Sequence, residues 1–197
     1  MGRHKSYDRD LVLEKAMELF WAKGYEGTHL SELVKVTGLN RFGLYAEFGG
    51  KEGLFRAALD LYLKWAQETY RKTLDAKPHG LDNIRTYFEE MSFGDEYSGC
   101  FMVKTIVEQN VVTNEAFSAA HEVFLEAKNL FHKNLCAAKE YGQLPPDRDI
   151  DALANLLSVI DSGLSIYGII SQSDSEKNAI AQQALLLLAS ISHKDNS

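Results

Sequence analysis

The 197-residue sequence contains few cysteines, few prolines and no long apolar run. Its two cysteines, Cys100 and Cys136, are far apart and belong to no CxxC pair, which argues against a disulfide framework and against a structural zinc site. No uninterrupted stretch reaches the roughly 18 apolar residues of a membrane span, and the polar N-terminus does not resemble a signal peptide. We therefore expect a cytoplasmic protein that does not enter a membrane and needs no metal or cofactor.

Signatures of catalysis are also missing. The sequence has no serine–histidine–aspartate signature, no glycine-rich phosphate loop, no HExxH motif and no clustered carboxylate pair. His121 and His132 fall on one predicted helix, where their spacing places them roughly 16 Å apart, too far for one metal ion. The sequence therefore predicts neither an enzyme nor a metalloprotein.

Alternating patterns of β-branched residues are absent, whereas apolar residues recur at helical spacing almost everywhere. The first three predicted helices are short and joined by glycine turns, which is typical of a helix-turn-helix unit. Thr28 is expected to cap the second helix and Asn40 the third. The sequence thus predicts an all-α fold, with a helix-turn-helix domain over residues 1–50 and a helical bundle over 51–197. The nine predicted helices span residues 8–23, 28–36, 41–48, 51–76, 81–93, 100–112, 114–141, 149–172 and 175–192.

Charge is distributed unevenly along the chain, whose net charge is −7. Residues 1–56 carry nine Lys or Arg against eight Asp or Glu, whereas the remainder carries twelve against twenty. An acidic body with a near-neutral to basic tip suits a protein that touches DNA with one end only.

Four motifs within residues 12–59 carry a resemblance to a known family. They are AMELF at 16–20, GYEGT at 24–28, VTGL at 36–39 and LYAEFGGKEGL at 44–54. In content and spacing they resemble the DNA-binding domain of TetR-family transcriptional regulators. The resemblance implies a nine-helix TetR-like fold and a homodimer, most simply a repressor, that binds a near-palindromic double-stranded operator and responds to a small-molecule effector.

In such a unit, side chains near the N-terminus of the third helix reach base edges in the major groove. Here these are Asn40, Arg41 and Phe42. Arg41 can donate to guanine O6 and N7, and Phe42 can contact a thymine methyl. The expected phosphate contacts are Tyr45 and Lys51, by the resemblance, and Thr28 at the start of the second helix. Arg3 and Lys5, in a basic N-terminal arm, are expected to contact phosphates or the minor groove.

The middle of the chain is rich in aromatic residues and methionine, which favours a cavity for a planar apolar effector. Asp161, in an otherwise apolar stretch, is a candidate for the polar group that orients this ligand, and a purely structural or dimer-facing role is equally open. The candidate ligand-binding residues are Tyr62, Trp65, Tyr87, Phe88, Met91, Cys100, Phe101, Phe124 and Asp161.

Cys100 lies in the segment SGCFMV at 98–103, which resembles the opening of the sixth helix in one TetR subset. In the first turn of a helix the dipole favours the reactive thiolate, and Lys104, one turn on, could assist. A sensor of oxidants or electrophiles is one interpretation. A buried, inert cysteine is the other.

The last two predicted helices are strongly apolar, and residues 184–189 are apolar on all sides. Such a pair is expected to meet its symmetry mate as a four-helix bundle, with a buried terminal helix as the alternative. For the whole protein, the alternative to a DNA-binding regulator is a helical ligand-binding or redox-sensing protein with a degenerate helix-turn-helix. The intact set of polar and basic residues at the tip argues against such decay.

Overall fold

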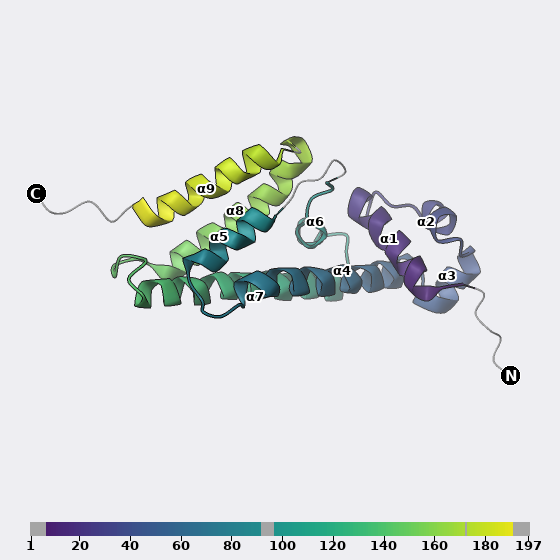
Figure 1. Cartoon of the computed structure of the whole chain (residues 1–197). Coiled ribbons are helices and arrows are strands. Elements are labelled where there is room, and N and C mark those ends of the chain that lie inside the picture. The colour runs from purple at the N-terminus through teal and green to yellow at the C-terminus, as the bar shows by residue number, and fades with distance from the viewer. Residues whose placement is uncertain (1–6, 92–96, 172, 191–197) are drawn as a thin grey trace, which may run out of the picture. The chain divides into compact units, whose positions relative to one another are not determined.

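The computed structural model describes residues 7–91, 97–171 and 173–190, and this part of the chain is helical with no strand (Figure 1). The prediction of an all-α, nine-helix fold is confirmed over these residues. The helices are α1 (Arg9–Lys23), α2 (Leu30–Thr37), α3 (Arg41–Phe48), α4 (Lys51–Leu74), α5 (Leu81–Glu90), α6 (Phe101–Val107), α7 (Asn114–Glu140), α8 (Ile150–Ser171) and α9 (Asp174–Ser190).

Side-chain caps and left-handed glycines explain where α1 and α3 begin and end. The Asp8 carboxylate accepts hydrogen bonds from the first-turn amides of α1, and the Asn40 side chain accepts one from the amide of Gly43 at 2.8 Å. Gly49 ends α3 in the left-handed region at φ 78°, where a side chain would be strained. The predicted bounds of α3 and its Asn40 cap are confirmed.

The start of α2 differs from the prediction. Its N-cap is His29, whose amide donates to the Glu32 carboxylate at 3.0 Å. Thr28 is fully buried instead, and its hydroxyl donates to the carbonyl of Gly24 at 2.7 Å. The prediction that Thr28 caps α2 is therefore wrong, because the hydroxyl completes the preceding turn.

α6 is shorter than predicted. Cys100 has extended backbone and is the N-cap, so that the helix begins at Phe101 and ends before Glu108. Cys100 thus precedes the first helical turn rather than lying within it. At the end of α5 the predicted helix extends to residue 93, and its last two residues lie outside the described part of the chain.

The chain divides into two compact units. The first contains α1, α2, α3, α6 and the beginnings of α4 and α7; the second contains α5, α8, α9 and the remainders of α4 and α7. α4 and α7 therefore each pass continuously from one unit into the other. The functional boundary predicted at residue 50 stays a prediction. The two units comprise residues 1–65 with 100–122, and 66–99 with 123–197.

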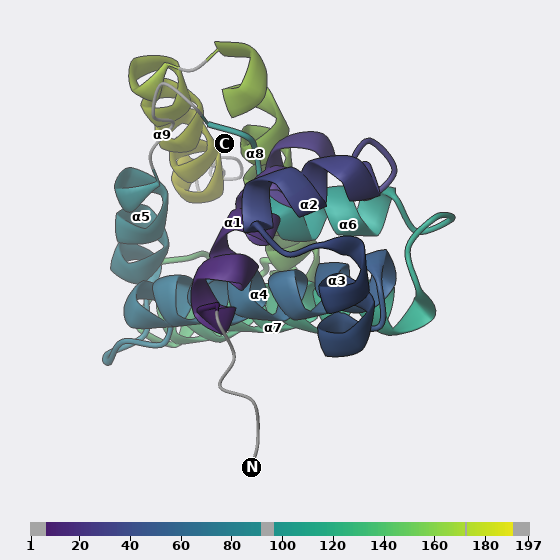
Figure 2. The same ribbon diagram turned by 90° about the vertical axis from the view of Figure 1, so that its right-hand side faces the viewer.

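Three phenylalanines hold the first unit together. The ring of Phe55 in α4 packs edge-on against Phe20 of α1 and Phe101 of α6, with distances of 5.0 Å and 5.5 Å between ring centroids. All three side chains are buried. Burying a side chain of this size contributes roughly 1.5–3 kcal/mol. This aromatic row anchors the helix-turn-helix on the start of α4, and α6 lies next to α1 (Figure 2).

In the second unit, Phe131 of α7 contacts Tyr87 and Phe88 of α5. The buried amide of Asn134 orders the turn after α4, since it donates to the Leu74 carbonyl at 2.7 Å and accepts from the Gly80 amide at 3.0 Å. Both partners are backbone groups that would otherwise be left unsatisfied in the interior. α5, α8 and α9 complete this unit (Figure 1).

Candidate nucleic-acid interface

The recognition helix α3 separates a buried face from an exposed one. Leu44 is fully buried and attaches the helix to the core. Arg41 is exposed, Phe42 is 83% exposed and Tyr45 is 51% exposed. An aromatic ring left in water this fully has no role in the core of the described chain, whereas it suits a surface that meets another molecule. The structure therefore presents three of the predicted DNA contacts on one short helix.

The first turn of α3 leaves room for a close approach. The Asn40 carboxamide oxygen is used by the cap, so that a base contact from this residue would come from its amide nitrogen. A Cβ added to Gly43 would meet the Asn40 oxygen at 3.4 Å and Leu39 at 3.6 Å, which is ordinary contact. The fold itself does not require glycine at position 43.

The corner between α3 and α4 is tight. A Cβ on Gly53 would overlap the carbonyl oxygen of Phe48 and lie 2.9 Å from its carbonyl carbon. The ring of Tyr45 lies against Gly50, where a Cβ would be 2.9 Å from a ring carbon. Gly50 also has a φ of 109°, which favours glycine. Sequence reasoning missed Gly53, although it belongs to the quoted motif.

Lys51 is held inside its own unit. Its ammonium group lies 4.2 Å from the centre of the Tyr25 ring, within the range of a cation–π interaction. Burial lowers the pKa of Lys51, while Glu108 and Glu26 act in the opposite direction. The expected phosphate contact by Lys51 stays a prediction.

Two further predicted contacts fare differently. Thr28 is 0% exposed and its hydroxyl is used internally, so that this side chain offers no surface to a phosphate. Arg3 and Lys5 lie outside the described residues. The start of α1 is tied to α3 by a contact the sequence did not suggest, the hydroxyl of Tyr7 donating to Glu47 at 2.6 Å.

The family model of bacterial regulatory proteins, tetR family, matches residues 12–58. The HTH-type transcriptional repressor ComR of Escherichia coli (strain K12) is 34% identical over 170 residues, which cover 84% of this chain and 81% of ComR. This chain belongs to the TetR family.

Two further relatives agree with this assignment. The uncharacterized HTH-type transcriptional regulator YezE of Bacillus subtilis (strain 168) is 32% identical over 163 residues, covering 80% of this chain and 84% of YezE. A solved structure of a cysteine-substituted variant of the TetR-family regulator CifR, complexed with a 26-base-pair operator DNA, is 30% identical with a TM-score of 0.80. That match covers 93% of this chain and 98% of the CifR chain. The resemblance to TetR-family regulators is thus confirmed.

In this TetR-family regulator the predicted ligand-binding residues fall into two groups, one in each unit. The group in the first unit is centred on Tyr62, whose hydroxyl donates to the Cys100 sulfur at 3.4 Å and whose ring meets Trp21 edge-on at 4.9 Å. Trp65 is 53% exposed, and Phe101 is buried in the aromatic row. The four predicted residues of this group are Tyr62, Trp65, Cys100 and Phe101.

Lys104 hydrogen-bonds to the end of α1. Its amino group donates to the carbonyl of Trp21 at 2.8 Å, at the end of α1, and burial lowers its pKa. The expected support of the Cys100 thiolate by Lys104 stays a prediction; the side chain hydrogen-bonds to backbone carbonyls of another helix.

In the group of the second unit, Asp161 of α8 is paired with Tyr87 of α5. The hydroxyl of Tyr87 donates to the Asp161 carboxylate at 2.8 Å, and burial raises the pKa of Asp161 to about 6, with that hydrogen bond acting against the rise. Phe88 is fully buried, while Met91 and Phe124 are half-buried. The five predicted residues of this group are Tyr87, Phe88, Met91, Phe124 and Asp161.

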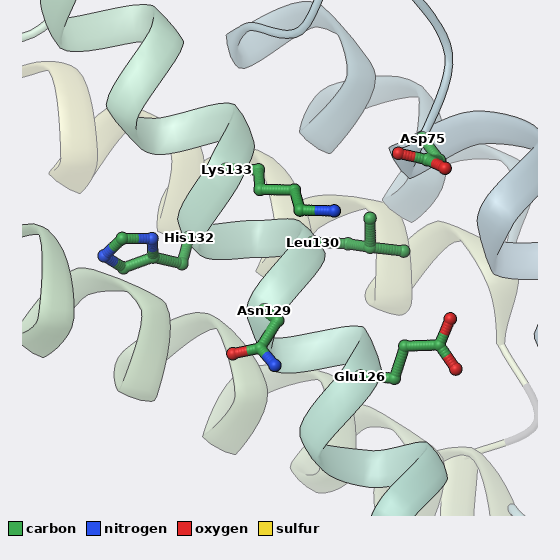
Figure 3. Close-up of a pocket in the computed structure, with 6 residues that line it drawn as sticks. All are labelled: Asp75, Glu126, Asn129, Leu130, His132 and Lys133. Atoms are coloured by element: carbon green, nitrogen blue, oxygen red, sulfur yellow. The ribbon is translucent and has the colours of Figure 1, made fainter.

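An open hollow on the second unit is of a different kind (Figure 3). Polar and charged side chains dominate its lining, and Leu130 is its one apolar member. Arg71 and Gln67 also hold Glu126, one of these lining residues. This hollow does not fit an aromatic effector and contains none of the predicted ligand-binding residues. It is lined by Asp75, Glu126, Asn129, Leu130, His132 and Lys133.

Proposed function

We propose that the protein is a dimeric transcriptional repressor that binds a near-palindromic operator through α3 and leaves it when its larger domain is occupied or modified. The exposed row on α3 carries this proposal, since Arg41, Phe42 and Tyr45 face outward from a helix whose Leu44 is buried. The names of relatives support it: ComR is a repressor, and CifR forms a complex with operator DNA. A DNA-binding regulator of this kind would act in the cytoplasm.

Exposed apolar side chains on the last two helices support a dimer. In α8, Val159 is 67% and Ile170 78% exposed, and in α9, Leu186 is exposed as well. α8 is also long and apolar enough to cross a membrane by length and mean hydropathy, with only 33% of its apolar window buried. We interpret this surface as the contact with a second copy, because α8 and α9 lie against each other and four such helices form a bundle.

Release from the operator is proposed to act through α4. This helix runs without a break from Lys51, beside the recognition helix, to Leu74 in the second unit. A rigid shift of its distal half would therefore move the DNA-reading helices. An effector changes this equilibrium only by its differential affinity for the two states, and a hundredfold loss of operator affinity needs about 2.7 kcal/mol.

Two triggers suit the two groups of predicted residues. A small apolar or aromatic effector could bind beside Tyr87 and Asp161, which would orient its polar group. Modification of Cys100 is the other trigger, because a group added to its sulfur would displace the Tyr62 hydroxyl. The Tyr62 ring contacts Trp21, near the end of α1, so that the displacement would reach the DNA-binding helices directly.

The DNA-binding part is tested by sequencing the fragments that the purified protein retains from its own genome. We expect a near-palindromic site with half-sites about one helical turn or a little more apart, bound by a dimer. Affinity should fall steeply with salt, because each phosphate contact releases counterions. A protein that prefers no fragment at moderate salt would contradict the proposal and favour a degenerate helix-turn-helix.

The cysteine trigger is tested by treating the protein–operator complex with mild oxidants or electrophiles. Cys100→Ser should bind the operator as the wild type does and no longer be released. Cys136→Ser is the matched control and should be released normally, since the second cysteine lies on α7 in the other unit. If the wild type stays on its operator under these reagents, the thiol trigger is excluded and the non-covalent effector remains.

A further inference from the structure

Lys104 on α6 binds the end of α1. Its amino group donates to the carbonyls of Trp21 at 2.8 Å and Ala22 at 3.5 Å, both in the last turn of that helix. The last carbonyls of a helix have no partner within the helix and carry its partial negative charge, so that a cation there is stabilising. Lys104 therefore attaches α6 to the end of α1, next to the connector between α1 and α2 (residues 24–29).

Glu108, one turn further along, binds the connector itself. Its carboxylate accepts from the amide of Tyr25 at 2.8 Å and from the amide of Glu26 at 3.3 Å. Hydrogen bonds from amides to a carboxylate are charge-assisted and stronger than neutral ones. The fit is close, since a Cβ on Gly24 would lie 2.6 Å from the Glu108 carboxylate. Gly24 also has a φ of 76°, where a side chain would be strained.

The connector is thus held from both sides. α4 holds it through Lys51, whose ammonium lies over the Tyr25 ring, and this ammonium is also attracted to Glu108. The covalent link between the DNA-binding helices and α4 is the turn at Gly49 and Gly50, where both residues have positive φ. Besides this turn, the buried contact of Phe20 with Phe55 joins the DNA-binding helices to α4. Lys104 and Glu108 add a polar attachment to α6, which restricts pivoting about the turn.

We propose that Lys104 and Glu108 fix the orientation of the DNA-binding helices and thereby set the half-site spacing that the dimer accepts. They would be specificity-determining residues that touch no base. Each inserted base pair moves one half-site by about 3.4 Å and rotates it by about 34–36° about the DNA axis. A rigidly held pair of recognition helices loses contacts under that change, whereas a pair free to pivot follows it. This inference rests on the proposed function.

The test compares full-length proteins on fluorescein-labelled operators that carry the native spacing or one inserted or deleted base pair, by anisotropy at fixed salt. The double variant Lys104→Met with Glu108→Gln removes both charges; Gln keeps the length of Glu, and Met is an unbranched side chain one atom shorter than Lys. The matched control, Lys64→Met with Glu18→Gln, makes the same changes at exposed positions of the same unit. Circular dichroism at the assay temperature establishes that each protein is folded.

The wild type and the control should prefer the native spacing at least tenfold over the altered ones. In the double variant this preference should fall below threefold, and affinity for the native site should fall as well. A purely structural pair would lower the melting temperature and leave the spacing preference unchanged, which would overturn the inference. So would a wild type that binds its operator without any preference for spacing. Should the double variant not fold, Glu108→Gln alone, which keeps one acceptor oxygen, gives the same comparison. A wild type that selects no DNA overturns the proposed function itself.

Discussion

Gly53 and Gly43 offer a matched pair of Gly→Ala substitutions in neighbouring helices of the DNA-binding unit. In a helix, alanine is favoured over glycine by up to about 1 kcal/mol, so that both substitutions would stabilise the protein if propensity alone decided. The surroundings separate them. A methyl group on Gly53 would overlap the Phe48 carbonyl oxygen, whereas one on Gly43 would meet its nearest neighbour, the Asn40 oxygen, at 3.4 Å.

We expect Gly53→Ala to force the α3–α4 corner open. Overpacking costs typically 1–3 kcal/mol, and here the obstacle is backbone, which cannot rotate away. That cost exceeds the gain in helix propensity. Net of that gain, up to about 2 kcal/mol of destabilisation remains, which for a chain of this length is a fall in Tm of up to roughly 8 °C. Operator affinity should fall at least tenfold, because Tyr45 and the rest of α3 are positioned by this corner.

Thermal and urea unfolding followed by circular dichroism, together with operator binding by anisotropy, measure both effects. Gly43→Ala should leave Tm unchanged or slightly raised. If this stable variant binds the operator more weakly than the wild type, the added methyl group must lie close to the DNA. A Gly53→Ala protein as stable as the wild type would refute the tight corner. Equal destabilisation by both substitutions would refute the contrast between them.

Two other predictions concern single side chains. Arg41→Ala should relax sequence preference and cost about 1–3 kcal/mol of binding free energy on the preferred site, whereas Lys51→Ala should weaken binding to all sequences similarly. The same uniform loss of affinity from both substitutions would show that Arg41 does not read bases. Burial raises the pKa of Asp161 to about 6, so that its carboxylate destabilises the folded state above that pH and the penalty is relieved as pH falls toward 4. In urea unfolding, Asp161→Asn should therefore be more stable than the wild type at pH 7 by up to about 3 kcal/mol, and this difference in unfolding free energy should shrink toward pH 5. A difference in unfolding free energy that does not change with pH would contradict the burial of this carboxylate.

The sequence predicted the helices because their signals are local. Asn40 caps α3 and Gly49 ends it, and a side chain or glycine adjacent to the helix supplies each signal without help from the rest of the chain. Successive residues of a helix lie about 100° apart, which allows Leu44 to face the core while Tyr45 faces outward. The quoted motifs then led to the TetR family.

Competing local signals produced the errors at α2 and α6. Thr28 and His29 can both precede a helix, and the choice depends on the Thr28 hydroxyl completing the turn back to Gly24. In the same way, Cys100 stands before the first turn of α6 rather than in it. Nothing in the pattern of apolar residues distinguishes these alternatives, because they differ by one residue.

Tertiary structure alone decided which distant side chains meet. The sequence placed Lys104 near Cys100 because the two are one turn apart, but the folded chain turns the lysine to carbonyls of α1 more than eighty residues earlier. It likewise brings Glu108 to the amides of Tyr25 and Glu26, a contact without any local signature. Helix boundaries are set by neighbours in sequence, whereas the attachment of the DNA-binding helices depends on contacts that exist only once α6 has packed beside α1.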